Sequence, residues 1–179
     1  MGLPALNEPR PNADVLVMTP NARTFAAPHA ADVTSLLPAR EALLAHLGER
    51  LPLTVRTSAT LMVIGLLRRH DGWPTAQSTL TEVTTLLARS LRGGDYLAKS
   101  GPGEFAVVLS GSVETAFVAA ERLVASIAVL GIPKLTAAAG VTALAPELTV
   151  AEVLRRGLVS LTAARRAGAG TVIRYREPY

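Results

Sequence analysis

An arginine and an aspartate three residues apart, Arg92 and Asp95, precede a Gly-Pro-Gly turn at residues 101–103. An arginine fork can donate two hydrogen bonds to a phosphate or to the acceptor edge of a guanine base, and a carboxylate can accept from N–H groups. The pair also has a purely structural interpretation, because an arginine at a helix end stabilises the helix dipole and an aspartate after two glycines can cap a loop. Spacing alone leaves both interpretations open.

Composition limits the other chemistry that the chain could carry. The sequence has no cysteine, which excludes disulfides, thiolate metal sites and a cysteine nucleophile. Its three histidines, His29, His46 and His70, are too scattered to form a ligand pair at helical spacing. The formal charge of +4 comes from dispersed arginines, which mildly favours an anionic partner but does not indicate nucleic-acid binding.

The 179 residues, 49% of them hydrophobic, suit one folded domain with a tail. Residues 1–31 contain five prolines and are predicted to be a tail or linker, and residues 32–179 are predicted to be the domain. No apolar run approaches the roughly 18 residues of a membrane span, and the first residues do not resemble a signal peptide. We therefore expect a cytoplasmic protein.

The residues that could do chemistry must be positioned by a regular series of elements. Helices are expected at 37–51, 75–91, 112–131 and 149–168, and strands at 53–67, 95–100, 104–109, 134–144 and 171–176. The order is helix, strand, helix, hairpin, helix, strand, helix, strand. This order predicts an α+β fold with a central, mostly antiparallel five-stranded sheet flanked by helices.

Five stretches, taken in order, resemble the GGDEF family, the diguanylate cyclase domains that condense two GTP into cyclic di-GMP. They are Asp32 with the following TSLLPAR, residues 91–109, 119–127, 136–141 and 163–173. The similarity runs from about Asp32 to about Arg176. It implies a nucleotidyl-cyclase-like fold.

The residues needed for catalysis depart from the family pattern. Phosphoryl transfer of this kind depends on divalent metal held by hard oxygen ligands. Gly65 and Leu67 stand where the family has metal-binding aspartates. In the signature turn GPGEF, Pro102 replaces the second glycine and Gly103 the acidic metal ligand, which leaves Glu104. We therefore expect a degenerate domain with no catalytic residues, no magnesium and no cyclase activity.

Substrate-contacting positions are altered as well. By the same resemblance, Gln77 falls at a guanine-reading aspartate, Leu158 replaces an aspartate of the last helix, and Arg165 stands at a phosphate-contacting lysine. The arginine pairs 155–156 and 165–166 are otherwise interpreted as one solvated helix face that could dock an acidic partner.

The resemblance also implies a second site, used for product inhibition, whose signature is an arginine and an aspartate three apart. Arg92 and Asp95 match it, and Arg122 falls at a third contributing arginine. The leading hypothesis is a cyclic di-GMP receptor that signals through an unidentified protein partner, with a ligand-bridged homodimer as a further expectation. The alternatives are a scaffold or dimerisation module that binds no nucleotide and a GTP-sensing domain, which Pro102 and Gly103 make least favoured.

Overall fold

The computed structural model describes residues 36–68 and 75–177, so the predicted tail at 1–31 lies outside the described residues. The described elements, in chain order, are α1 (Arg40–Arg50), the 3₁₀ helix η1 (Leu51–Val55), β1 (Ala59–Arg68), α2 (Gln77–Ser90), β2 (Tyr96–Gly101), β3 (Glu104–Ser110), α3 (Val113–Ala128), β4 (Leu135–Ala143), α4 (Val150–Ala167) and β5 (Val172–Arg174).

The five strands form one sheet in the order β2-β3-β1-β4-β5. The pairs β2–β3, β3–β1 and β1–β4 are antiparallel, and β4–β5 is parallel. This confirms the predicted α+β fold with a mostly antiparallel five-stranded sheet. The apolar run 61–64 lies in β1 at the centre of the sheet, where a strand is covered on both faces.

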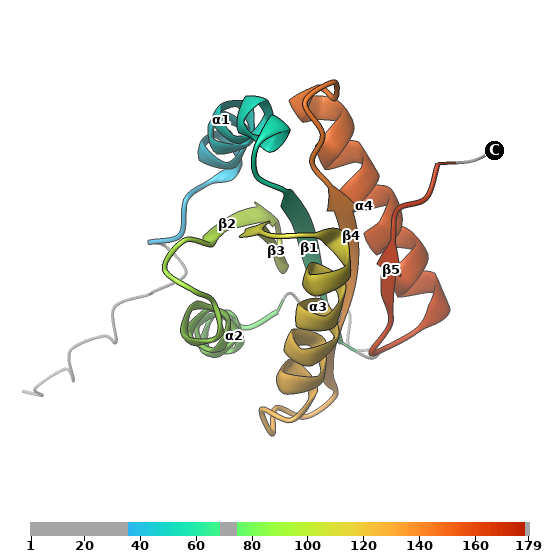
Figure 1. Cartoon of the computed structure of the whole chain (residues 1–179). Coiled ribbons are helices and arrows are strands. Elements are labelled where there is room, and N and C mark those ends of the chain that lie inside the picture. The colour runs from blue at the N-terminus through green and yellow to red at the C-terminus, as the bar shows by residue number, and fades with distance from the viewer. Residues whose placement is uncertain (1–35, 69–74, 178–179) are drawn as a thin grey trace, which may run out of the picture. The chain divides into compact units, whose positions relative to one another are not determined.

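Helices cover the sheet in two layers (Figure 1). Successive side chains of a strand point to opposite faces. Met62 and Ile64 accordingly pack in a core with α2 and α3, whereas Leu61 and Val63 pack in a second core with α1 and α4. Among the described helices, none is long and apolar enough to cross a lipid bilayer.

The first predicted strand was too long at its N-terminal end. Residues 51–55 form η1, with Pro52 at the start of the helix, and β1 begins only at Ala59. The β-branched residues of this segment favour a strand, but proline fixes φ and lacks the N–H that an interior strand residue donates. The segment therefore continues the preceding helix as a 3₁₀ turn before the chain enters the sheet.

Helix α4 lies unusually close to β4 because two glycines face each other. A Cβ on Gly140 would overlap the backbone nitrogen of Leu161 and the carbonyl oxygen of Gly157. A Cβ on Gly157 would in turn lie 3.0 Å from a methyl carbon of Val63. This close contact holds the helix against the sheet and directs the side chains near its C-terminal end over the end of β1.

Candidate functional site

The corner between α2 and β2 holds Arg92 and Asp95 in a closed turn. The backbone N–H of Asp95 donates to the carbonyl of Arg92 at 3.0 Å, and the backbone N–H of Arg92 donates to Asp95 Oδ2 at 2.9 Å. Asp95 therefore has the structural role that the sequence left open. A carboxylate can accept several bonds, so this contact leaves it further acceptor capacity. The Arg92 side chain is exposed, and its guanidinium has no bond to another described residue.

Arg122 reaches the same region from α3. The helix begins after Ser112, whose hydroxyl accepts from the backbone N–H of Thr115 at 3.4 Å. Arg122 lies on the exposed face of α3, and its guanidinium likewise has no hydrogen bond or ion pair with a described residue. The carbonyl of Arg122 accepts from Ser126, which fixes the backbone but leaves the charged head unconstrained.

Two adjoining hollows, of about 70 and about 470 Å³, join the α2–β2 corner to α3. Arg92 and Arg122 line both of them, and Asp95 lines the smaller. The structure thus brings all three predicted site residues to one surface region. The two guanidiniums bring positive charge to this region, which makes it suited to an anion.

Sequence reasoning missed one charged residue of this region, Glu114, which lines the larger hollow. Arg174 Nη1 donates to Glu114 Oε1 at 2.7 Å. Hydrogen bonds from its own backbone N–H and from Ser112, together with Arg174, hold the pKa of Glu114 below its usual value. Its charge is thus compensated from β5 rather than by Arg92 or Arg122. The serine-initiated helix start at 112–114 was the signal that could have placed Glu114 here.

The face that the resemblance associates with catalysis holds an internal ion pair. Arg165 Nη1 donates to Glu104 Oε1 at 2.7 Å, with side chains 32% and 19% exposed. A Cβ on Gly65 would lie 2.8 Å from both Cζ and Nε of Arg165. The guanidinium therefore occupies the space into which a longer side chain at position 65 would project. The predicted single solvated face for the arginine pairs was wrong here, because neighbouring helix residues point about 100° apart and Arg165 turns towards the sheet.

A divalent metal centre does not fit this arrangement. Magnesium is held by oxygen ligands, and Gly65, Leu67 and Gly103 have no side-chain oxygen. Glu104 is already paired with Arg165, and a cationic guanidinium repels a metal ion. Within residues 36–68 and 75–177, no group of three or more His, Cys, Asp or Glu side chains is arranged to hold a metal.

The signature turn has a glycine in the left-handed conformation at its third position. Gly103 has φ of +64°, as expected at the third position of a turn with proline second. Its carbonyl accepts from the backbone N–H of Leu66 at 2.9 Å, so the turn is tied to β1.

A hollow of about 630 Å³ beside this turn lies between the starts of α1 and α2. Gln77, at the position of the family's guanine-reading aspartate, lines it together with Pro102 and Gly103. Arg40 also lines the hollow, and its Nη1 donates to the carbonyl of Ser100 at 3.2 Å.

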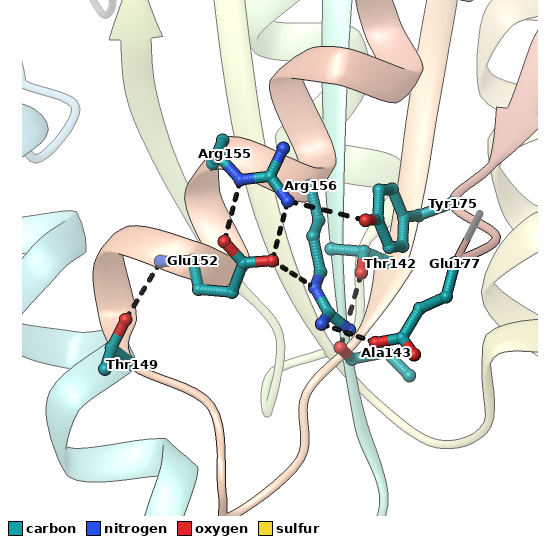
Figure 2. A network of polar contacts seen from close by, with 8 residues as sticks. All are labelled: Thr142, Ala143, Thr149, Glu152, Arg155, Arg156, Tyr175 and Glu177. Carbon is teal, nitrogen blue, oxygen red and sulfur yellow. Dashed lines mark hydrogen bonds and ion pairs between the residues drawn. The ribbon is translucent and has the colours of Figure 1, made fainter. Parts of the chain in front are cut away.

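The other arginine pair of α4, Arg155 and Arg156, belongs to a polar network that includes Tyr175 and Glu177 (Figure 2). Glu152 accepts from Arg155 Nε and from Arg156 Nε, both at 2.7 Å, and Arg156 also pairs with Glu177 at 2.6 Å. These hydrogen bonds lower the pKa of Glu152 to about 2. Arg156 is only 17% exposed and lies 4.9 Å over the ring of Tyr175, so it too departs from the predicted solvated face.

No protein-family model and no curated protein sequence matches this chain. Solved structures do. The GGDEF domain of TpbB (YfiN) from Pseudomonas aeruginosa has a TM-score of 0.70 at 22% identity, over 80% of this chain and 92% of that one. The active GGEEF domain of a diguanylate cyclase from Vibrio cholerae has a TM-score of 0.68 at 22% identity, over 79% of this chain and 99% of that one.

The GGDEF domain of DgcB from Caulobacter crescentus, solved in complex with c-di-GMP, has a TM-score of 0.67 at 18% identity and covers 79% of this chain and 92% of its own. All three comparisons cover at least 79% of this chain and at least 92% of the compared domain. The described part of this chain therefore has the fold of the GGDEF domains of diguanylate cyclases.

Proposed function

We propose that residues 32–179 form a catalytically inactive GGDEF domain that binds cyclic di-GMP through Arg92, Asp95 and Arg122 and signals through contacts with a protein partner. The observation that carries the proposal is the convergence of one carboxylate and two exposed guanidiniums on a single surface region, where neither guanidinium is compensated by a described residue.

The chemistry of the ligand suits these groups. Cyclic di-GMP carries two phosphates and two guanine bases, so each arginine has an anion or an acceptor edge to bind. Asp95 keeps acceptor capacity for guanine N–H groups beyond its bond to the Arg92 backbone. The fold comparison adds support, because the GGDEF domain of DgcB forms a complex with this ligand.

The proposed loss of catalysis rests on residues at the opposite end of the sheet from Arg92 and Asp95. The three positions that would need metal-binding carboxylates are Gly65, Leu67 and Gly103. The remaining carboxylate, Glu104, is neutralised by Arg165, so the domain is not expected to organise GTP and magnesium for phosphoryl transfer.

A scaffold that binds no nucleotide is the second candidate, and the Arg92–Asp95 turn favours it. The Asp95 carboxylate accepts from the Arg92 backbone N–H, and the Asp95 backbone N–H donates to the Arg92 carbonyl, so Asp95 is accounted for without any ligand. A GTP sensor is a weaker third candidate, because Pro102 removes a backbone N–H from the phosphate-facing turn.

Calorimetric titration of the full chain with cyclic di-GMP and with GTP separates these functions. A hydrogen bond to a charged group contributes about 1.5–3 kcal/mol, so Arg92→Ala and Arg122→Ala should each weaken cyclic di-GMP binding by roughly 10- to 100-fold. Arg89→Ala, which removes another exposed arginine one turn earlier, is the matched control and should bind normally.

Absence of heat with cyclic di-GMP would overturn the receptor proposal in favour of the scaffold. Undiminished binding by Arg92→Ala would move the site elsewhere, and binding of GTP alone would favour the sensor. Formation of cyclic di-GMP from GTP and magnesium would overturn the proposed inactivity. Sedimentation with and without ligand tests the expected ligand-bridged homodimer, which requires a doubled mass only when cyclic di-GMP is present.

A further inference from the structure

A groove of about 720 Å³ runs between α1 and α4, on the face of the sheet opposite α2 and α3. Its long wall is a stripe of α4 residues three or four apart, from Ala151 to Arg166. Residues at this spacing share one helix face, so the stripe follows α4 for about 22 Å, at about 1.5 Å for each residue.

The floor of the groove is apolar. Leu154 is buried, Leu158 is half-buried and Val159 is 47% exposed. This gradient means that the apolar stripe of α4 is wider than α1 and the sheet can cover. A continuous apolar strip that ends in solvent is typical of a surface that packs against another molecule.

The rim of the groove is basic. Arg40, Arg155 and Arg166 line it, and no aspartate or glutamate among residues 36–68 and 75–177 does. Glu152, beside the groove, compensates Arg155. The other two charges are not compensated within the described residues: Arg40 donates to the neutral carbonyl of Ser100, and Arg166 makes no ion pair.

We propose that this groove docks an acidic amphipathic helix of a partner protein. The apolar floor suits leucine-like residues at positions i, i+3 or i+4, and i+7 of such a helix, and its length matches about 15 helical residues. Carboxylates flanking the apolar stripe would meet Arg40 and Arg166. A protein that carries such a helix would be the partner in the proposed signalling. Docking in this groove does not depend on nucleotide binding, because the groove lies across the sheet from Arg92 and Arg122.

Two other occupants fit less well. A second copy related by a two-fold axis would bring the basic rim against itself, since such an interface uses the same patch on both subunits. A lipid surface is flat on this scale and would leave the floor of a groove between two helices uncovered. The proposal therefore commits to a protein helix with negative charge.

The test uses the full chain and a display library of helical peptides about 15 residues long. Their apolar stripe is fixed as leucine, and their flanking positions are randomised among glutamate, lysine and glutamine. We expect selection to enrich glutamate at the flanks. The selected peptides should bind Val159→Asp and Arg166→Glu at least about tenfold more weakly. Val129→Asp, at another exposed valine, is the matched control and should bind normally.

Enrichment of lysine or glutamine, no enrichment at all, or equal binding by Val159→Asp would each overturn the proposal. Two further measurements address the other occupants. Self-association of the chain that Val159→Asp abolishes would assign the groove to a second copy, and binding to phosphatidylserine vesicles that the same change abolishes would assign it to a membrane. The calorimetric titration with cyclic di-GMP is independent of these outcomes, so the two proposals can fail separately.

Discussion

Gly65 and Arg165 should be coupled in stability, because the guanidinium lies where a side chain at position 65 would project. Substitution Gly65→Ala would place its methyl group within 2.8 Å of Cζ and Nε of Arg165. Real carbon atoms do not approach so closely, so the arginine must move. Its head is the end of a flexible side chain and can swing away, but it then loses its 2.7 Å bond to Glu104.

The magnitude follows from the burial of the pair. Exposed ion pairs contribute about 0.2–1 kcal/mol, and hydrogen bonds to charged groups contribute about 1.5–3 kcal/mol. With side chains 32% and 19% exposed, we take about 1.5 kcal/mol for Arg165–Glu104. Replacing glycine by alanine in a strand stabilises by about 0.5 kcal/mol through the unfolded chain. Gly65→Ala should thus lower the free energy of unfolding by about 1 kcal/mol.

In the Arg165→Ala background, where the pair is already absent, Gly65→Ala should raise the free energy of unfolding by about 0.5 kcal/mol. Urea unfolding of the wild type, both single variants and the double variant measures the coupling, expected to be about 1.5 kcal/mol. Gly93→Ala, at a glycine with open space around its Cβ position, should be additive with Arg165→Ala and serves as the control. Additivity of Gly65→Ala and Arg165→Ala within about 0.5 kcal/mol would refute the reasoning.

Two further predictions concern α4. Gly140→Ala should lower the free energy of unfolding by about 3 kcal/mol, because its methyl group meets backbone rather than a movable side chain; a melting temperature within a degree or so of the wild type would contradict this. The pKa of Glu152 is about 2 in the folded protein against 4.5 as its ordinary value, so its contribution to stability is complete above about pH 4.5 and is lost as the pH falls towards 2. Urea midpoints of the wild type and Glu152→Gln should therefore differ most near neutral pH and converge in acid, and a constant difference would rule this out.

Periodicity was sufficient to predict most of the architecture. The short apolar run at 104–109 corresponds to β3, a strand covered on both faces of the sheet. The 3.6-residue pattern of 112–131 corresponds to α3, because a helix that buries one face requires that repeat. The N-terminal part of the strand predicted at 53–67 was wrong, since β-branched composition is only a weak preference and Pro52 shifted the chain into η1. Propensity is decided locally, but the point where a strand enters a sheet depends on its neighbours.

The sequence likewise predicted one part of the candidate site, and the other part depended on the fold. The residue types at 65, 67 and 103 excluded a carboxylate metal centre from sequence alone, because glycine and leucine have no side-chain ligand. The sequence could not show that the Arg165 guanidinium occupies the space beside Gly65, because the two residues lie far apart in the chain. Only the close contact of α4 with β4 directs the guanidinium over β1.

Sequence by itself determined the order of elements, the missing ligands and the spacing of Arg92 and Asp95. Tertiary structure decided that Arg122 joins that pair, that Glu114 is compensated from β5, and that α4 carries an apolar stripe wider than its cover. Side-chain type and local spacing are properties of the chain alone. Which charges face one another, and which apolar surface stays open, depends on how helices pack on the two faces of the sheet.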